Sequence, residues 1–144
     1  MRKLLIFPYN GNGREAVDCA QDQYEIIGFI DDTEAKQGQQ PGGIEIFSRE
    51  ILHKYKDVSV LAVPGSPASY LQRKMIIEGL HVPAQRFATV IHPQATVSVS
   101  AHVGYNVLIM AGVVITRKKC IGVCFGNFDI PLPLDAELIL RILV

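Results

Sequence analysis

The sequence has little of what marks a charged, secreted or membrane-spanning chain. Its 14 basic and 14 acidic residues balance, and the basic residues form no long run, which argues against nucleic acid or an anionic membrane as a partner. Only the short apolar run Leu4 to Phe7 follows Arg2 and Lys3, which is too short for a signal peptide or a membrane span. We therefore expect a cytoplasmic protein with no nucleic-acid and no membrane partner.

Cysteine is also scarce. Cys19, Cys120 and Cys124 are too few and too scattered for a disulfide framework, which fits a reducing compartment. Cys120 and Cys124 lie four residues apart without a nearby histidine, so a zinc site there would lack ligands. We expect buried thiols and no metal.

Residues 1–88 alternate short apolar runs with helical patterns. The expected helix caps are Ser48 and, as a capping box, Ser69 with Gln72. The expected strands are 3–7, 24–30, 44–47 and 58–63, and the expected helices are 14–21, 48–55 and 69–79. This order is typical of a doubly wound parallel sheet, so we predict an α/β, Rossmann-like domain over 1–88.

Three loops of this sheet lie where such folds bind ligands, because loop amides and helix dipoles at the carboxyl ends of the strands attract anions. They are residues 8–13, 31–33 and 64–69. Glycines in the first loop let a phosphate approach the backbone, and carboxylates in the second can accept hydrogen bonds from a ribose or a base. The candidate binding residues are Asn10, Gly11, Asn12, Gly13, Asp31, Asp32, Pro64, Gly65 and Ser66.

The glycine loop contains a dinucleotide-binding pattern. Residues 11–16 match G-x-G-x-x-G/A, and Asp31 and Asp32 lie near the expected distance downstream. However, residues 8–10 separate the first glycine from the strand, whereas the pattern begins at the turn that leaves the strand. We therefore favour a nucleotide other than NAD as the ligand of this loop. A third interpretation is that the glycines only close a turn.

Two further patterns receive no chemical role. Residues 65–68 (GSPA) follow a strand as a nucleophile elbow does, but they lack the closing glycine of G-x-S-x-G and a placed histidine. Arg73 and Lys74 lie on the next expected helix and are interpreted as solvated side chains.

From residue 91 branched apolar residues recur every six positions. They are Ile91, Val97, Val103, Ile109, Ile115 and Ile121. This period is typical of the hexapeptide form of the parallel β-helix, with the branched residue facing inward. Residues 89–126 would supply about two coils, fewer than the roughly three repeats that a solenoid normally needs. The alternative is a pair of hairpins, and 127–144 is expected to be an atypical apolar tail.

The order of these parts resembles one protein family. The residues that carry the resemblance are KLLIF, the glycine loop leading into Gly-Arg-Glu, YEIIGFIDD, and FATVIHP before the hexads. Over residues 2–122 they resemble the sialic acid O-acetyltransferase family, which includes N-acetyltransferases of UDP-linked amino sugars. The resemblance implies a left-handed β-helix that trimerises and acetyl-CoA between neighbouring helices. It also implies phosphates near residues 10–13 and uridine near Asp31 and Asp32.

The sequence departs from the family at the catalytic position. The family's general base is a histidine in a coil beyond Ile121, and no histidine follows His102 here. His92 and His102 do not match that position and are interpreted as surface or structural residues. Pro8 and Asn12 replace a usual glycine and histidine of the loop. We therefore predict no catalytic residue, altered binding specificity, and a truncated β-helix that does not bind acetyl-CoA.

Four functions follow as hypotheses. The first is a UDP-sugar-binding protein descended from an acetyl-CoA-dependent acyltransferase of polysaccharide or glycan synthesis, with its chemistry lost. The second is an acyltransferase whose base comes from another group or chain. The third is a non-enzymatic oligomerisation or regulatory module, and the fourth is a small NAD-binding protein.

Overall fold

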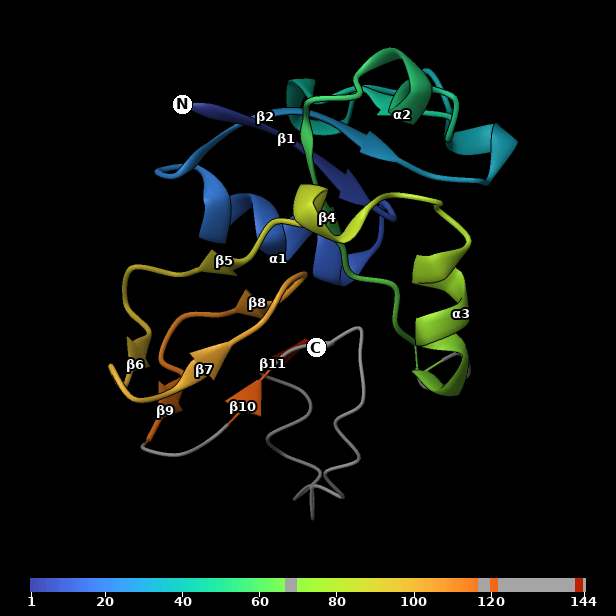
Figure 1. Cartoon of the computed structure of the whole chain (residues 1–144). Helices are drawn as coiled ribbons and strands as arrows, with labels where there is room; N and C mark the ends of the chain where they lie inside the picture. The colour runs from blue at the N-terminus through green and yellow to red at the C-terminus, as the bar shows by residue number, and fades with distance from the viewer. Residues whose placement is uncertain (67–69, 117–119, 122–141, 144) are drawn as a thin grey trace.

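The structure is a computed structural model that describes residues 1–66, 70–116, 120–121 and 142–143 (Figure 1). Its first part is a four-stranded sheet with strand order β3-β2-β1-β4, in which every neighbouring pair is parallel. The strands are β1 (Arg2–Phe7), β2 (Tyr24–Ile30), β3 (Ile46–Phe47) and β4 (Ser59–Ala62). The predicted parallel α/β sheet is confirmed.

Short helices connect these strands. The α-helices in the described residues are α1 (Gly11–Ala20), α2 (Ile51–Lys54) and α3 (Arg73–Glu78). The 3-10 helices there are η1 (Glu34–Lys36), η2 (Pro41–Gly43), η3 (Tyr70–Gln72) and η4 (Ala84–Arg86). None of the helices in this described part is long and apolar enough to cross a membrane.

The helix boundaries differ from those predicted. Helix α1 begins at Gly11 rather than at residue 14, so the glycines form its first turn and not a separate loop. The predicted helix 48–55 shortens to the four residues of α2, and Ser48 does not cap it, since the N-cap is Glu50 without a side-chain hydrogen bond. The predicted cap at Ser69 lies outside the described residues. The predicted helix starts were wrong here because glycine and serine occur both in loops and in the first turns of helices.

The hexads form six two-residue strands at intervals of six residues. They are β5 (Val90–Ile91), β6 (Thr96–Val97), β7 (His102–Val103), β8 (Leu108–Ile109), β9 (Val114–Ile115) and β10 (Cys120–Ile121). β5 pairs with β8, β6 with β9 and β7 with β10, always parallel. Each pair is offset by 18 residues (108 − 90, 114 − 96 and 120 − 102), so three strands make one repeat. The parallel pairing excludes the hairpin alternative.

The strands β5–β10, called the coil below, enclose an apolar interior. Ile109 and Ile115 are buried, as the six-residue period predicts, and Val107 and Val113 pack with them. Of the predicted apolar tail, only β11 (Ile142–Leu143) is described, and it pairs antiparallel with β8.

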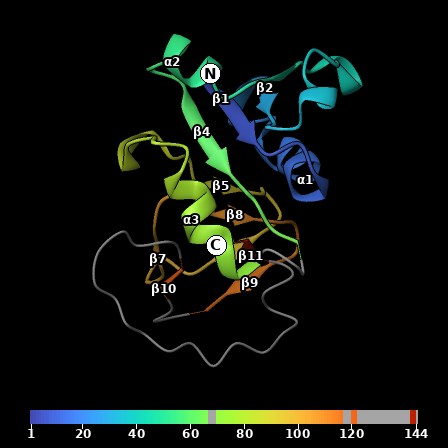
Figure 2. The same ribbon diagram turned by 90° about the vertical axis from the view of Figure 1, so that its right-hand side faces the viewer.

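The two faces of the sheet have separate apolar clusters, because alternate residues of a strand point to opposite faces. Leu4 and Ile6 of β1 pack with α1 and with Val90 and Leu108 of the coil. On the other face Leu5 and Phe7 pack with α2 and α3, and α1 and α3 lie on opposite sides of β4 in Figure 2. The first cluster thus continues across the predicted domain boundary at residues 88 and 89, which stays a prediction.

A buried asparagine attaches the coil to the sheet. Asn106 Oδ1 accepts a hydrogen bond from Ala62 N at 2.7 Å, and Asn106 Nδ2 donates to Ala62 O at 2.8 Å. Asn106 is 0% exposed and has a φ of 57°, a left-handed conformation that asparagine tolerates better than most residues. Its amide therefore satisfies both backbone groups of the last residue of β4.

Candidate functional site

The three predicted binding loops meet at the carboxyl ends of β1, β2 and β4. Asn10 Nδ2 donates to Val63 O at 3.4 Å, which joins the first loop to the end of β4. Lys36 Nζ donates to Tyr9 O at 3.2 Å and to Asp31 Oδ2 at 2.9 Å, which joins the first loop to the second. The structure thus brings together the loops that the strand order predicted to share this edge.

The first turn of α1 lies at the centre of this edge. Asn10 is in extended backbone, and its Oδ1 accepts from Gly13 N at 2.7 Å, so it caps the helix. The N–H groups of Gly11 and Asn12 precede any possible intrahelical acceptor. They therefore present donors and the positive end of the helix dipole at the site, an arrangement that suits an anion.

The two glycines of this turn differ in their surroundings. A Cβ at Gly13 would collide with the carbonyl oxygen of Pro8, whereas a Cβ at Gly11 would meet nothing within 4 Å. Gly13 is therefore required for the close packing of the helix start against the end of β1. Gly11 leaves open space beside the N–H groups.

The third loop lies against the first. A Cβ at Gly65 would be 3.4 Å from Asn12 Nδ2 and 3.8 Å from Arg73 Nη1, so both side chains lie next to Gly65. Pro64 is buried, and Ser66 is exposed. Residues Pro67 and Ala68 of the predicted loop lie outside the described residues.

The interpretation of Arg73 as solvated is wrong. Arg73 is half-buried at the start of α3, its Nη1 donates to Pro64 O at 2.5 Å, and burial lowers its pKa to about 10. Helix α3 begins at Arg73 rather than at the predicted residue 69, and from this first position the side chain reaches back to Pro64 in the third loop. Lys74 is exposed and pairs with Glu78 at 3.9 Å, as a solvated residue does.

Both acidic candidates already have protein partners. Asp31 is buried and accepts from Thr33 N at 2.9 Å as well as from Lys36 Nζ. Asp32 receives a two-point hydrogen bond from Arg49, with Nε–Oδ1 at 2.5 Å and Nη2–Oδ2 at 2.7 Å. These contacts fix the second loop, and a direct role of either carboxylate in ligand binding stays a prediction.

Replacing Asp31 with asparagine should destabilise the protein in a pH-dependent way. Burial would raise the pKa of Asp31, but hydrogen bonds from Lys36 and Thr33 outweigh it and lower the pKa below its usual value. A lowered folded-state pKa gives stability that is present above about pH 4 and is lost as pH falls further. Asp31→Asn should therefore reduce the free energy of unfolding by about 1–3 kcal/mol at pH 7.

Urea denaturation at pH 7 and near pH 3 measures this effect, with Asp32→Asn as the matched control. Asp32 is more exposed, so its removal should cost at most about 1 kcal/mol. An Asp31→Asn loss of equal size at both pH values would contradict the role of the charge.

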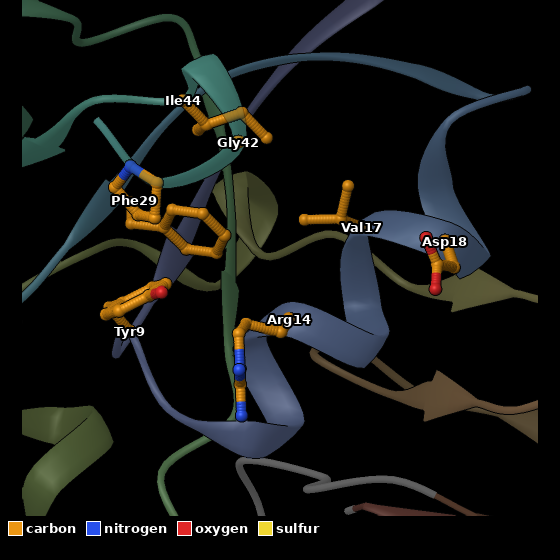
Figure 3. A pocket seen from close by; sticks show the side chains of 8 residues that line it. Tyr9, Arg14, Val17, Asp18, Phe29, Gly42 and Ile44 are labelled. Carbon is orange, nitrogen blue, oxygen red and sulfur yellow. The ribbon is translucent and has the colours of Figure 1, made fainter.

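A hollow of about 370 Å³ lies beside the first loop (Figure 3). The Tyr9 and Phe29 rings, which meet edge to face with centroids 5.0 Å apart, form part of its wall. Its lining residues are Tyr9, Arg14, Val17, Asp18, Phe29, Pro41, Gly42 and Ile44. Sequence reasoning missed it because the wall comes from four separate segments, and only Tyr9 belongs to a predicted binding loop.

The remaining candidate residues carry no evident chemistry. His92 Nδ1 accepts from Gln94 N at 3.0 Å within a local turn, and His102 is exposed, in agreement with structural and surface roles. Burial, and then Glu15 and Asp18, raise the pKa of Cys19 to about 11, so its thiol is not reactive. The described part of the chain contains no group of three or more His, Cys, Asp or Glu residues that could hold a metal ion.

Solved structures share the fold of this chain. A mutant of perosamine N-acetyltransferase from Caulobacter crescentus, in complex with CoA and GDP-perosamine, matches with a TM-score of 0.66 and 18% identity over 85% of this chain and 57% of that one. The acetyltransferase domain of PglB from Neisseria gonorrhoeae matches with a TM-score of 0.67 and 25% identity over 84% of this chain and 59% of that one. The same domain has been solved with acetyl coenzyme A.

These matches extend over only part of their length, since the chain spans 57–59% of these two structures. No protein-family model matches the chain, and no curated protein matches it. One of these structures is a perosamine N-acetyltransferase and the other is an acetyltransferase domain, which supports the sugar acyltransferase family that the sequence resembles. The chain has the fold of the sugar N-acetyltransferases.

Proposed function

We propose that this chain binds a sugar nucleotide at the carboxyl edge of its parallel sheet, with the diphosphate at the first turn of α1. The observation that carries the proposal is the meeting of three loops around the open N–H groups of Gly11 and Asn12. Such a helix start stabilises phosphate through its amides and its dipole. The resemblance favours a UDP-linked amino sugar, and one neighbour's complex contains GDP-perosamine.

We further propose that β5–β10 form about two coils of a left-handed β-helix after a Rossmann-like domain. The six-residue spacing and the 18-residue pairing offset support this proposal. Trimer formation and acetyl-CoA between neighbouring coils remain what the family resemblance implies. We assign no base for acetyl transfer, because His92 is held in a turn, His102 is exposed, and neither lies at the family's catalytic position.

Thermal unfolding with UDP, GDP, a UDP-linked amino sugar and NAD at matched concentrations tests the binding proposal. A ligand of the native state present at a hundred times its Kd adds about 2.7 kcal/mol of stability. We expect UDP compounds to raise the melting temperature and NAD to leave it unchanged. A shift with GDP alone would change the base but keep the site. The proposal would be overturned if only NAD raised the melting temperature, or if none of the nucleotides did.

The second candidate function is an oligomerisation module. We base it on the exposed apolar side chains of Val99, Tyr105 and Val114 within residues 96–115, since contacts between chains would remove them from water. This function would be preferred if the chain assembled but bound none of the nucleotides.

A further inference from the structure

Arg73 places a half-buried cation next to the proposed phosphate site. It is the first residue of α3, and its Nη1 donates to Pro64 O at 2.5 Å while Nη2 lies 3.5 Å from Ala62 O. Its guanidinium and the side-chain amide of Asn12 both lie within 4 Å of where a Cβ of residue 65 would be. The side chain therefore reaches from the face of α3 to the edge of the sheet where the three loops meet.

This cation has no anionic partner among the described residues. The ion pairs of that part of the chain are Lys36–Asp31, Arg49–Asp32 and Lys74–Glu78. A guanidinium has five N–H donors, and Arg73 Nε is buried without an acceptor. Burial lowers the pKa of Arg73, with no carboxylate acting against it. Partial burial of a charge without a counterion is unfavourable, so an anion placed beside it would be stabilised.

We infer that Arg73 contacts the diphosphate of the bound sugar nucleotide and makes the site distinguish nucleotides from nucleosides. The inference rests on the proposed function. Arginine suits this role because its planar fork of donors matches the oxygens of a phosphate and stays charged at neutral pH. Gly65 assists, since any side chain at this position would start within 4 Å of both Arg73 Nη1 and Asn12 Nδ2.

Isothermal titration of the whole chain with UDP, uridine and inorganic pyrophosphate tests this assignment. The variants are Arg73→Gln and Arg73→Met, which remove the charge, and Arg73→Lys, which keeps it. Lys74→Gln is the matched control, because it removes one positive charge from the adjacent, exposed residue. Arg73→Met keeps the test open if glutamine prevents folding, since an apolar residue of similar volume is tolerated where a charge was buried.

We expect both neutral variants to weaken UDP and pyrophosphate binding by about tenfold or more, as the loss of a charged hydrogen bond predicts. Uridine binding should change by less than about twofold, and Arg73→Lys should restore part of the UDP affinity. Lys74→Gln should behave as the unchanged protein. A merely structural role would weaken UDP and uridine alike.

The outcomes separate the inference from the function on which it rests. If the unchanged protein binds none of UDP, GDP and pyrophosphate, the proposed function fails. If it binds UDP and the neutral variants bind UDP equally well, or lose UDP and uridine in the same proportion, only the assignment of Arg73 is overturned.

Discussion

Replacing Asn106 with alanine is expected to lower the free energy of unfolding by about 2–5 kcal/mol. The asparagine amide pairs with both the N–H and the carbonyl of Ala62. Its removal leaves the buried N–H without a partner and leaves the carbonyl with only the 3.5 Å hydrogen bond from Arg73 Nη2. An unpartnered buried N–H costs about 1–3 kcal/mol. The left-handed φ of 57° adds about 1–2 kcal/mol for alanine, which lacks the asparagine side chain's tolerance of that conformation.

Urea denaturation of Asn106→Ala and Asn106→Gly measures the two contributions. Glycine adopts a positive φ freely but cannot supply the amide, so Asn106→Gly should recover only the conformational part of the loss. If both variants unfolded within about 0.5 kcal/mol of the unchanged protein, the side-chain bridge between coil and sheet would not contribute to stability.

Replacing Gly13 with alanine is expected to destabilise the protein by about 1–3 kcal/mol, since the added methyl group must displace the backbone at Pro8. Gly11→Ala is the matched control in the same helical turn. It places its methyl group in open space and exchanges a poor helix former for a good one, so it should be neutral or stabilise by up to about 1 kcal/mol.

Chemical denaturation of the two variants side by side measures this difference. Opposite or clearly unequal effects of two glycines two residues apart would show that the contact with Pro8 requires Gly13. Equal effects would contradict this packing and indicate that general helix propensity decides both.

The regular parts of the fold could be predicted because their periodicity reports burial directly. Leu4 to Phe7 lies in a run without polar residues and forms a strand covered on both faces. Ile109 and Ile115 recur at six residues and lie inside the coil. The meeting of the binding loops also followed from sequence, since strand order alone brings carboxyl ends to a common edge.

The specific contacts could not be predicted, because their partners lie far apart in the sequence. Asn106 bonds to a residue 44 positions away, and nothing next to Asn106 in sequence indicates that partner. Arg73 follows a loop and has a charged neighbour, so its local pattern resembles that of a solvated residue. Asp32 lies 17 residues from Arg49, whose side chain occupies both of its carboxylate oxygens.

The 18-residue pairing offset limits how this part of the chain can change in length. Strands β8, β9 and β10 each lie beside the strand 18 residues earlier, so a deletion or insertion of 18 residues within the coil would keep the branched residues in the same register. A change of one residue would turn the inward side chains of later strands toward solvent, because successive residues of a strand face opposite ways. Whole repeats are therefore the unit in which such a coil can be lengthened or shortened while the carboxyl edge of the sheet, where the three loops meet, stays as it is.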